Sequence, residues 1–272
     1  MAAREPVLVN GQPLEAGVVL IDKPVGITSF AVVRKLRRLL GIKKIGHAGT
    51  LDPFASGLLI LCVGRGATRH IDQFMQGQKE YEAVLQLGVE TDTLDLEGTV
   101  LATEPVGQLN DEAVCACLRS FVGPGMQAPP AFSAVKHRGK PLYHYARRGV
   151  MIQKDPRPIE IYNLEYLGYD AASRQLSLRV ECSRGTYVRV LASDIGRKLG
   201  CGAHLCALRR TGSGCFPVHE ALDGGVLDSG RGLPTLLDAI MPVPEALSRH
   251  GNKNETNCLP ARPSGPDTMG QM

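Results

Sequence analysis

The chain has few aromatic residues and no tryptophan: aromatic side chains make up 5% of its 272 residues. It has no apolar run long enough to span a membrane and no leader of the kind that directs secretion. A net charge of +4 is too small to indicate a nucleic-acid partner by itself. We therefore expect a cytoplasmic protein whose core is built from aliphatic side chains, which an apolar fraction of 43% is sufficient to form.

The eight cysteines lack the CxxC spacing of common zinc and redox motifs. Most lie in apolar patterns such as Leu61-Cys62-Val63. Cys201, His204 and Cys206 come closest to a metal-binding group, but their spacing matches no common zinc pattern and a fourth ligand is not evident. We therefore predict free thiols in a reducing compartment, buried side chains at these three positions, and no metal.

Charge is segregated along the sequence. Between residues 31 and 71, eight Lys or Arg residues stand against the single acid Asp52, whereas residues 85–118 contain seven acids and no Lys or Arg. Such segregation suits a protein that binds a polyanion on one face. Two solvated surfaces of opposite charge would give the same pattern, so composition alone leaves both interpretations open.

Hydrophobic periodicity predicts alternating strands and helices over most of the chain. The clearest strand covers 175–182, where apolar and polar residues alternate, and the clearest helix begins after Thr28 or Ser29 and ends at Gly41. Further strands are predicted at 17–24, 58–63, 81–88, 159–170 and 202–211, with helices at 71–74, 111–121 and 188–199 and an acidic connection over 89–109.

The segment 123–149 differs from the rest in composition. It begins Gly-Pro-Gly, continues with Pro129-Pro130, and carries Tyr143 and Tyr145 among basic residues that include Lys136, His137, Arg138, Lys140, Arg147 and Arg148. Basic and aromatic side chains together suit a surface that binds phosphates and stacks bases. A mobile solvated loop has the same composition, and the two descriptions are compatible.

The stretch from Gly46 to Ile60 places one carboxylate, Asp52, among small residues. Its glycines allow tight turns or close approach to a ligand, and Pro53 biases Asp52 toward an extended backbone. Because an apolar run follows directly, we expect Asp52 on a stiff, exposed turn that leads into the core. From these residues alone, a reactive carboxylate and an ordinary turn capped by Asp52 both fit.

Four motifs carry a family resemblance. GHAGTLDPFASGLL (46–59) closely resembles the catalytic motif of the TruB family of tRNA pseudouridine synthases, and VLIDKPVGITSF (19–30) resembles the first motif of that family. SRGTYVRVLASDIG (183–196) resembles the motif whose arginine pairs with the catalytic aspartate, and PPAFSAVKHRGKPLYHYARRG (129–149) resembles a thumb-like insertion that folds against RNA. The resemblance covers roughly residues 15 to 220.

The resemblance implies catalytic roles that no single residue would reveal by itself. Asp52 is the expected nucleophile, Arg189 the cation that pairs with it and holds it ionised, and Tyr81 the ring that stacks on the target base and takes part in proton transfer. Without the resemblance these side chains would be interpreted as turn, surface or core residues. The implied substrate-binding residues are His47, Tyr81, Tyr187, Leu208 and Lys23, and the expected RNA phosphate contacts are Lys136, Arg138, Lys140, Arg147, Arg209 and Arg210.

The implied fold is α+β: a mixed, largely antiparallel sheet flanked by helices, with a central active-site cleft and a basic thumb-like loop. We expect one catalytic domain over 1–247, with the thumb at about 123–152, and a polar, disordered tail over 248–272 that is too short for a complete PUA domain.

The implied reaction is isomerisation of uridine to pseudouridine at position 55 in the T loop of tRNA, which needs no cofactor. We expect a monomer that acts on the T arm without a guide RNA or a membrane. Two alternatives belong to other classes: a non-catalytic RNA-binding or tRNA-folding module, and a nucleoside hydrolase.

Overall fold

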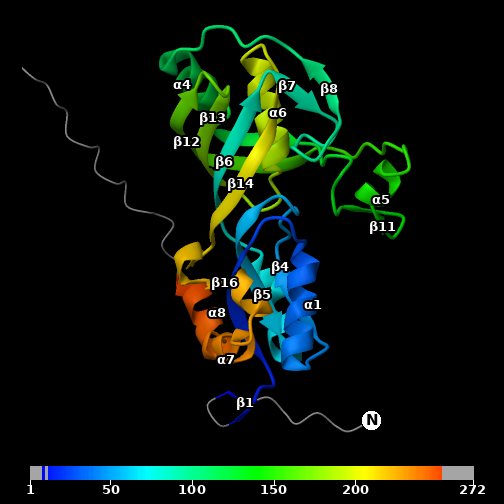
Figure 1. The fold of residues 1–272 in the computed structure, drawn as a ribbon, viewed down its shortest axis with the longest axis vertical. Helices are drawn as coiled ribbons and strands as arrows, with labels where there is room; N and C mark the ends of the chain where they lie inside the picture. The colour runs from blue at the N-terminus through cyan, green and yellow to red at the C-terminus, as the bar shows by residue number, and fades with distance from the viewer. Residues whose placement is uncertain (1–7, 10–11, 253–272) are drawn as a thin grey trace, which may run out of the picture.

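The computed structural model describes residues 8–9 and 12–252. One ten-stranded sheet runs the length of the molecule (Figure 1). Its strands follow the order β16-β3-β5-β14-β6-β13-β12-β9, with β4 paired to β5 and β15 paired to β14. Within the described residues, the strands of this sheet pair in parallel only at β5–β14 and β3–β16. The predicted mixed, largely antiparallel α+β fold is therefore confirmed.

The strands of this sheet are β3 (Gly17–Lys23), β4 (Ile45–Ala48), β5 (Ser56–Val63), β6 (Lys79–Leu87), β9 (Gly123–Gln127), β12 (Arg157–Asp170), β13 (Gln175–Cys182), β14 (Ala203–Ser213), β15 (Phe216–Pro217) and β16 (Leu222–Asp223). Three two-stranded hairpins accompany it: β1 (Leu8–Val9) with β2 (Gln12–Pro13), β7 (Val89–Thr91) with β8 (Val100–Thr103), and β10 (Lys136–His137) with β11 (Lys140–Pro141).

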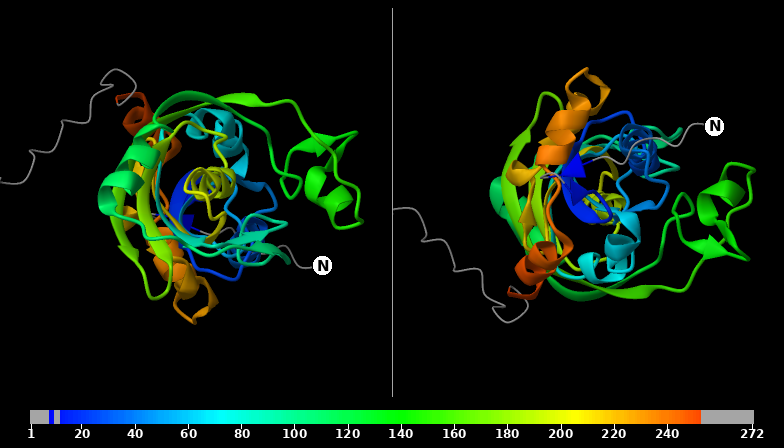
Figure 2. Two further views of the ribbon diagram at one scale, coloured as in Figure 1. Left: turned by 90° about the horizontal axis from the view of Figure 1, so that it is seen from above. Right: turned by 90° about the horizontal axis from the view of Figure 1, so that it is seen from below.

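Helices cover the sheet at both ends. Near one end the sheet curves around α6, which packs on β6 and β14, while α1, α7 and α8 surround β3 and β5 at the other end (Figure 2). The α-helices are α1 (Ser29–Leu40), α2 (Gly64–Thr68), α3 (Ile71–Phe74), α4 (Asp111–Arg119), α5 (Leu142–Ala146), α6 (Val188–Lys198), α7 (Gly232–Asp238) and α8 (Val243–Asn252), with short 3₁₀ turns at η1 (Val218–Glu220) and η2 (Gly224–Asp228). Among these described helices, none is long and apolar enough to cross a membrane.

Local sequence explains why these elements form where they do. The side chain of Thr28 accepts a hydrogen bond from the Ala31 N–H at the start of α1, and Gly41 ends that helix in the left-handed conformation at φ 70°. In β13, buried and half-buried residues alternate along the whole strand, as the period of two predicts. The entirely apolar part of β5 is buried on both faces: Leu59, Leu61 and Val63 belong to a core cluster with α1 and α7, whereas Leu58, Ile60 and Cys62 belong to one with α3 and α8.

Three predicted boundaries need correction. The segment 123–127 is β9, an edge strand of the sheet, so the insertion begins after Gln127; Pro124 is tolerated because an edge strand has unpaired positions. The acidic connection contains the β7–β8 hairpin, which charged residues hid from the periodicity analysis. The last helix, α8, continues beyond residue 247 to Asn252, and His250 is buried against Phe74. The remainder of the expected tail, 253–272, lies outside the described residues.

Candidate active site

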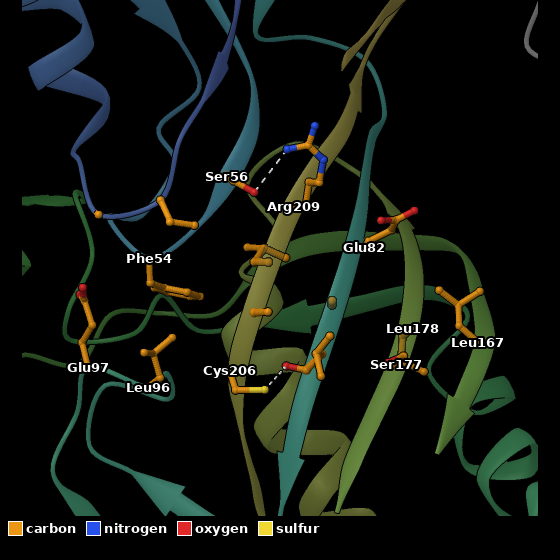
Figure 3. Close-up of a pocket in the computed structure, with 16 residues that line it drawn as sticks. Phe54, Ser56, Glu82, Leu96, Glu97, Leu167, Ser177, Leu178, Cys206 and Arg209 are labelled. Atoms are coloured by element: carbon orange, nitrogen blue, oxygen red, sulfur yellow. Dashed lines mark hydrogen bonds between the residues drawn. The ribbon is translucent and has the colours of Figure 1, made fainter. Parts of the chain in front are cut away.

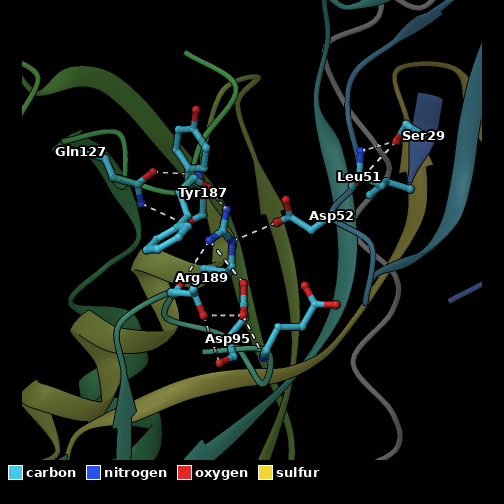
Figure 4. A network of polar contacts seen from close by, with 10 residues as sticks. Ser29, Leu51, Asp52, Asp95, Gln127, Tyr187 and Arg189 are labelled. Carbon is cyan, nitrogen blue, oxygen red and sulfur yellow. Dashed lines mark hydrogen bonds and ion pairs between the residues drawn. The ribbon is translucent and has the colours of Figure 1, made fainter. Parts of the chain in front are cut away.

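Asp52 lies on a loop between β4 and β5 that is held from several sides (Figure 4). The buried hydroxyl of Ser29 accepts a hydrogen bond from the Leu51 N–H (2.9 Å) and donates one to the Leu51 carbonyl (3.0 Å). Beyond the loop, Gly57 adopts φ 102° and lies so close to β14 that an added Cβ would be 2.3 Å from the Arg210 carbonyl oxygen. The loop therefore presents a fixed carboxylate.

The carboxylate of Asp52 forms an ion pair with Arg189 from the first turn of α6. The Nε of Arg189 lies 2.9 Å from Asp52 Oδ2, and the arginine side chain is only 4% exposed. The remaining guanidinium nitrogens are also engaged: Nη1 donates to the Thr93 carbonyl (2.8 Å) and lies 3.4 Å from Asp95 Oδ2, and Nη2 donates to the Phe132 carbonyl (3.0 Å). Partners from three separate segments, the Asp52 loop, residues 93–95 and Phe132, thus fix the orientation of this cation.

Burial and the neighbouring charges shift the pKa of Asp52 in opposite directions. Burial raises the pKa of its carboxyl above the ordinary value, the Arg189 guanidinium lowers it, and the negative charge of Asp95 raises it. The sum leaves the pKa raised. Arg189 therefore favours the ionised form of Asp52, but its charge offsets only part of the effect of burial and of Asp95.

Asp95 is a site residue that the sequence analysis missed. It is 5% exposed, its Oδ1 accepts hydrogen bonds from the Thr93 hydroxyl (2.6 Å) and the Glu97 N–H (3.0 Å), and its backbone bridges to Leu205 of β14. In the sequence it is one of seven acids in an acidic segment, so nothing local separates it from the exposed ones. Its burial results from the pairing with β14, which periodicity does not reveal.

Tyr81 and Arg210 face each other across β6 and β14. Tyr81 is 8% exposed, and burial raises the pKa of its hydroxyl, which Arg210 lowers in part. Arg210 is 2% exposed and donates to the carbonyls of Leu58 (2.7 Å) and Gly49 (3.2 Å). The prediction that Arg210 contacts RNA phosphates is therefore wrong: the alternation of β14 turns this side chain inward, where backbone oxygens bind its guanidinium.

The neighbouring Arg209 points to the opposite face of β14, where it is bound by Asp22. Its Nη1 lies 3.0 Å from Asp22 Oδ1, and Nη2 bonds to the second carboxylate oxygen. The charge of Arg209 is thus already matched by a carboxylate of β3. Because its side chain is still 38% exposed, a phosphate contact at this residue stays a prediction.

Lys23 is buried next to the loop that carries Asp52. It is fully buried at the end of β3, and its ammonium donates to the carbonyls of Pro24 and Ile27 (both 2.8 Å) and of Pro53 (3.3 Å). Burial lowers the pKa of Lys23 to about 8, an effect that the charge of Asp52 opposes. The predicted substrate contact is therefore corrected: this lysine binds the loop that carries Asp52.

The other predicted pocket residues gather around the same loop. His47 is half-buried in β4, and burial, followed by the charge of Arg210, lowers the pKa of its ring, so it is neutral at pH 7. Leu208 is 9% exposed on β14, opposite Ala83 of β6. Tyr187 is the residue before α6, next to the helix turn that carries Arg189.

A pocket of about 650 Å³ lies beside β14 (Figure 3). Leu208 and Phe54, the latter two residues beyond Asp52, belong to its lining, but Asp52 itself does not. The β14 residues that line it are 206–209. They begin after the bridge between Leu205 and Asp95 and end at Arg209, where the pairing of β14 with β5 begins. The loop that carries Asp52 thus borders a cavity beside β14, through Phe54.

The three residues whose metal-binding role the sequence argued against, Cys201, His204 and Cys206, each contact a backbone carbonyl. The Cys201 thiol faces the Gly196 carbonyl, Nδ1 of His204 lies 2.9 Å from the Val89 carbonyl, and the Cys206 thiol donates to the Val84 carbonyl (3.2 Å). Across residues 8–9 and 12–252, no group of three or more His, Cys, Asp or Glu side chains is arranged to hold a metal ion.

Comparison with known proteins places this geometry in a family. The family model for the N-terminal domain of TruB pseudouridylate synthases matches residues 37–188, and the model for the tRNA pseudouridylate synthase B C-terminal domain matches residues 189–248. Two similar relatives are proteins named tRNA pseudouridine synthase B. The one from Desulfotalea psychrophila is 57% identical over 78% of this chain and 87% of its own, and the one from Aromatoleum aromaticum is 50% identical over 76% and 66%.

Solved structures agree on the fold. A Cbf5–Nop10–Gar1 complex contains a chain that is 30% identical with a TM-score of 0.65 over 86% of this chain, and an H/ACA ribonucleoprotein bound to a substrate RNA contains one that is 27% identical with a TM-score of 0.63. This chain spans only 62% and 61% of those two chains. With family models matching residues 37–248 and a relative at 57% identity, the chain belongs to the TruB family of pseudouridylate synthases.

Proposed function

We propose that this protein isomerises uridine to pseudouridine at position 55 in the T loop of tRNA, with Asp52 as the nucleophile. The observation that carries the proposal is the Asp52–Arg189 ion pair, at 2.9 Å, on a loop whose sequence is the family's catalytic motif. The names of the relatives support tRNA as the substrate. The two alternatives, an RNA-binding module and a nucleoside hydrolase, are outcomes of the test below.

The reaction breaks the N-glycosidic bond, turns the uracil and rejoins it to C1′ through C5, with loss of the C5 proton. Asp52 would form a covalent bond with either the sugar or the uracil ring, and only its ionised form is a nucleophile. Arg189 stabilises that form, and Asp95 fixes the far side of the same guanidinium. Because the pKa of Asp52 is raised, activity is expected to increase with pH through that pKa.

Tyr81 supplies a ring and a protonated hydroxyl in the same cluster. Its pKa is raised, so the hydroxyl keeps its proton at neutral pH; it would donate that proton to the freed N1 of the uracil and could then, as phenolate, accept the proton that C5 loses. The ring is fixed by packing with Leu51 and Phe54 of the catalytic loop. We propose that it stacks on the target uracil, with Leu208 and Tyr187 as further walls of the base site.

The target base must leave its stack before Asp52 reaches it, at a cost of a few kcal/mol. His47 lies five residues before Asp52 in the strand next to β5, and its ring is neutral because burial lowers its pKa. A neutral, flat ring with hydrogen-bonding nitrogens is suited to the position that the flipped base vacates. We assign it that role, which offsets part of the cost.

RNA contacts are expected from the thumb and from α1. Lys136, Arg138, Lys140 and Arg147 are exposed on the thumb, where the Arg147 guanidinium lies 5.6 Å from the ring centre of Tyr143. On α1, Phe30 is 54% exposed, with two arginine side chains over its ring. Such aromatic–cation groups bind bases and phosphates together. We propose that the protein acts as a monomer and needs no guide RNA.

The test is incubation of the purified protein with an unmodified tRNA transcript, followed by chemical mapping of pseudouridine. We expect one product, at position 55, in unchanged full-length RNA. Release of free uracil would instead identify a nucleoside hydrolase, and bound but unmodified tRNA would identify a binding module. A T-arm hairpin added in a parallel reaction shows whether one stem and loop is a sufficient substrate.

A further inference from the structure

The thumb is attached to the catalytic body through a short root. It leaves the sheet after Gln127, the last residue of β9, and returns at Arg157, the first residue of β12, which are direct neighbours across the two strands. Between them, α5 and the β10–β11 hairpin project away from the body (Figure 1). The thumb therefore comprises residues 128–156, and its position relative to the sheet is set at its two attachments, Gln127 and Arg157.

The side-chain amide of Gln127 binds the residue that precedes α6. Its Oε1 accepts a hydrogen bond from the Tyr187 N–H (2.7 Å), and its Nε2 donates to the Tyr187 carbonyl (3.1 Å) (Figure 4). Gln127 is 6% exposed. The N–H groups at a helix N-terminus lack partners inside the helix, and a tyrosine side chain has no short polar group to cap them. A residue at the thumb root thus provides this contact at the start of α6.

A second contact joins the same root to the catalytic arginine. Nη2 of Arg189, two residues after Tyr187, donates to the carbonyl of Phe132 in the thumb (3.0 Å), while Nε of the same guanidinium faces Asp52. A guanidinium is planar and rigid, so a shift of one nitrogen reorients the others. The position of the thumb root and the direction of the Arg189–Asp52 contact are therefore mechanically linked.

We propose that Gln127 is a positioning residue for the isomerisation: its amide holds the thumb root on α6, so that the Phe132 carbonyl and Asp52 orient one guanidinium together. The proposal rests on the proposed function, because Arg189 acts there on the nucleophile. It implies that the thumb, when RNA holds it against the body, also sets the catalytic ion pair. RNA binding by the thumb and alignment of the Arg189–Asp52 pair would then be thermodynamically coupled, so that each favours the other.

The deciding variant is Gln127→Met, which keeps the length of the side chain and removes both hydrogen bonds. Gln175→Met is the matched control, because Gln175 also uses its side-chain amide but bonds to Gln86 at the far end of β13. We expect kcat at saturating tRNA to fall about tenfold in the first variant, through misalignment, with little change in KM. The control should keep the kcat of the unchanged protein.

A second measurement does not depend on turnover. The charged groups that act on Asp52 are Arg189 of α6, Asp95 of the loop after β7, and Lys23 of β3. If Gln127 orients Arg189, its loss weakens only the first of these, and the Asp52 carboxyl, followed by carbon NMR in RNA-free protein, should titrate at higher pH. The amide of Tyr187 should also exchange faster with solvent.

These readouts separate the two proposals. If the unchanged protein makes no pseudouridine, the proposed function fails, and the titration of Asp52 still tests the positioning role. An unchanged Asp52 titration in folded Gln127→Met protein would overturn the role of Gln127. A loss of activity that merely follows the fraction of unfolded protein, with an unmoved pH–rate profile, would also overturn it, because Gln127 would then be a structural residue.

Discussion

Two buried arginines of this protein have opposite surroundings. Arg189 and Arg210 are 4% and 2% exposed, and both lie near the loop that carries Asp52. Arg189 faces two carboxylates, Asp52 and Asp95, whereas Arg210 donates to the neutral carbonyls of Leu58 and Gly49. The first cation lowers the pKa of Asp52, the proposed nucleophile, and the second holds strands and loop together. Burial alone does not distinguish the two roles, but the partner does.

The largest expected effect comes from replacing Asp52, the carboxylate that pairs with Nε of Arg189. Asp52→Asn should lower turnover by at least ~10⁴-fold, because the amide is similar in shape but is not a nucleophile. Asp22→Asn is the matched control, since Asp22 also pairs with an arginine but lies outside the catalytic cluster. Pseudouridine formation under single-turnover conditions is the measurement. Comparable losses in both variants would mean that the Asp52 effect is not specific to its role.

The same variant also tests the linkage between charge and stability. The pKa of Asp52 is raised in the folded protein, so its ionised form is less stable there than in the unfolded chain. This costs stability at pH values above the ordinary carboxyl pKa and is relieved as the pH falls through the folded pKa. Asp52→Asn should therefore not lower Tm at pH 7, and a clear decrease would contradict the burial argument.

The next effect separates the two arginines. Arg189→Met should lower kcat by roughly 10²–10³-fold, because a preorganised cation is lost from the reacting group. It also removes the main influence that lowers the Asp52 pKa, so the acidic limb of the pH–rate profile should move to higher pH. An unmoved profile with a normal rate would show that Arg189 does not act on Asp52.

Arg210→Met is the counterpart and should act on stability. Two buried carbonyls lose their donor, which costs about 2–5 kcal/mol, and Tm should fall by roughly 5–15 °C for a chain of this size. In the folded fraction, the acidic limb of the pH–rate profile should stay in place. If Arg210→Met moves that limb as far as Arg189→Met does, the division between a catalytic and a structural cation is wrong.

Two buried lysines, one beside the Asp52 loop and one away from it, allow the same comparison with a smaller expected effect on kcat. Lys23 and Lys79 are both buried, both donate to three backbone carbonyls, and the pKa of each is lowered to about 8 by burial. Only Lys23 binds the catalytic loop, through Pro53. Lys79→Met should lower Tm and leave kcat unchanged, whereas Lys23→Met should lower Tm and reduce kcat about tenfold through a looser loop. Equal kcat values in the two variants would remove Lys23 from the site.

The sequence predicted local interactions better than contacts between segments that lie far apart in the chain. The cap at Thr28, the alternation of β13 and the motif around Asp52 are local patterns, and the structure agrees with them. The Arg189–Asp52 pair joins two segments far apart in the chain, and the family resemblance alone indicated it.

The residues that were missed or misplaced depend on tertiary contacts. Asp95 is buried because β14 pairs with its backbone, and Gln127 matters because β9 ends beside α6. Arg210 points inward because it faces Tyr81 across two strands. When two basic residues are adjacent in a strand, the local sequence does not indicate which of the two side chains is buried. The basic pair Arg209-Arg210 was therefore expected to bind RNA as a unit, although the two side chains lie on opposite faces.

The smallest effect on chemistry is expected from cations that are exposed rather than buried. Lys136, Arg138 and Lys140 of the thumb are exposed to solvent. Replacing all three by Ala should raise KM for tRNA and leave kcat nearly unchanged, because these side chains are not part of the Asp52 cluster. The plot of log affinity against log salt should become flatter by up to about 2–3 units if all three neutralise phosphates, at about 0.7–0.9 per contact.

A control with the same change in net charge replaces Arg119, Arg174 and Lys198, which are also exposed but lie outside the thumb. General electrostatic attraction would flatten the salt dependence in both triple variants, whereas specific phosphate contacts flatten it only in the thumb variant. The thumb variant should also bind a T-arm hairpin and whole tRNA with equal losses, since both present the same stem and loop. An effect confined to whole tRNA would place the thumb against another part of the substrate, and a neutral thumb variant would show that the phosphates are bound elsewhere, with α1 as the next surface to test.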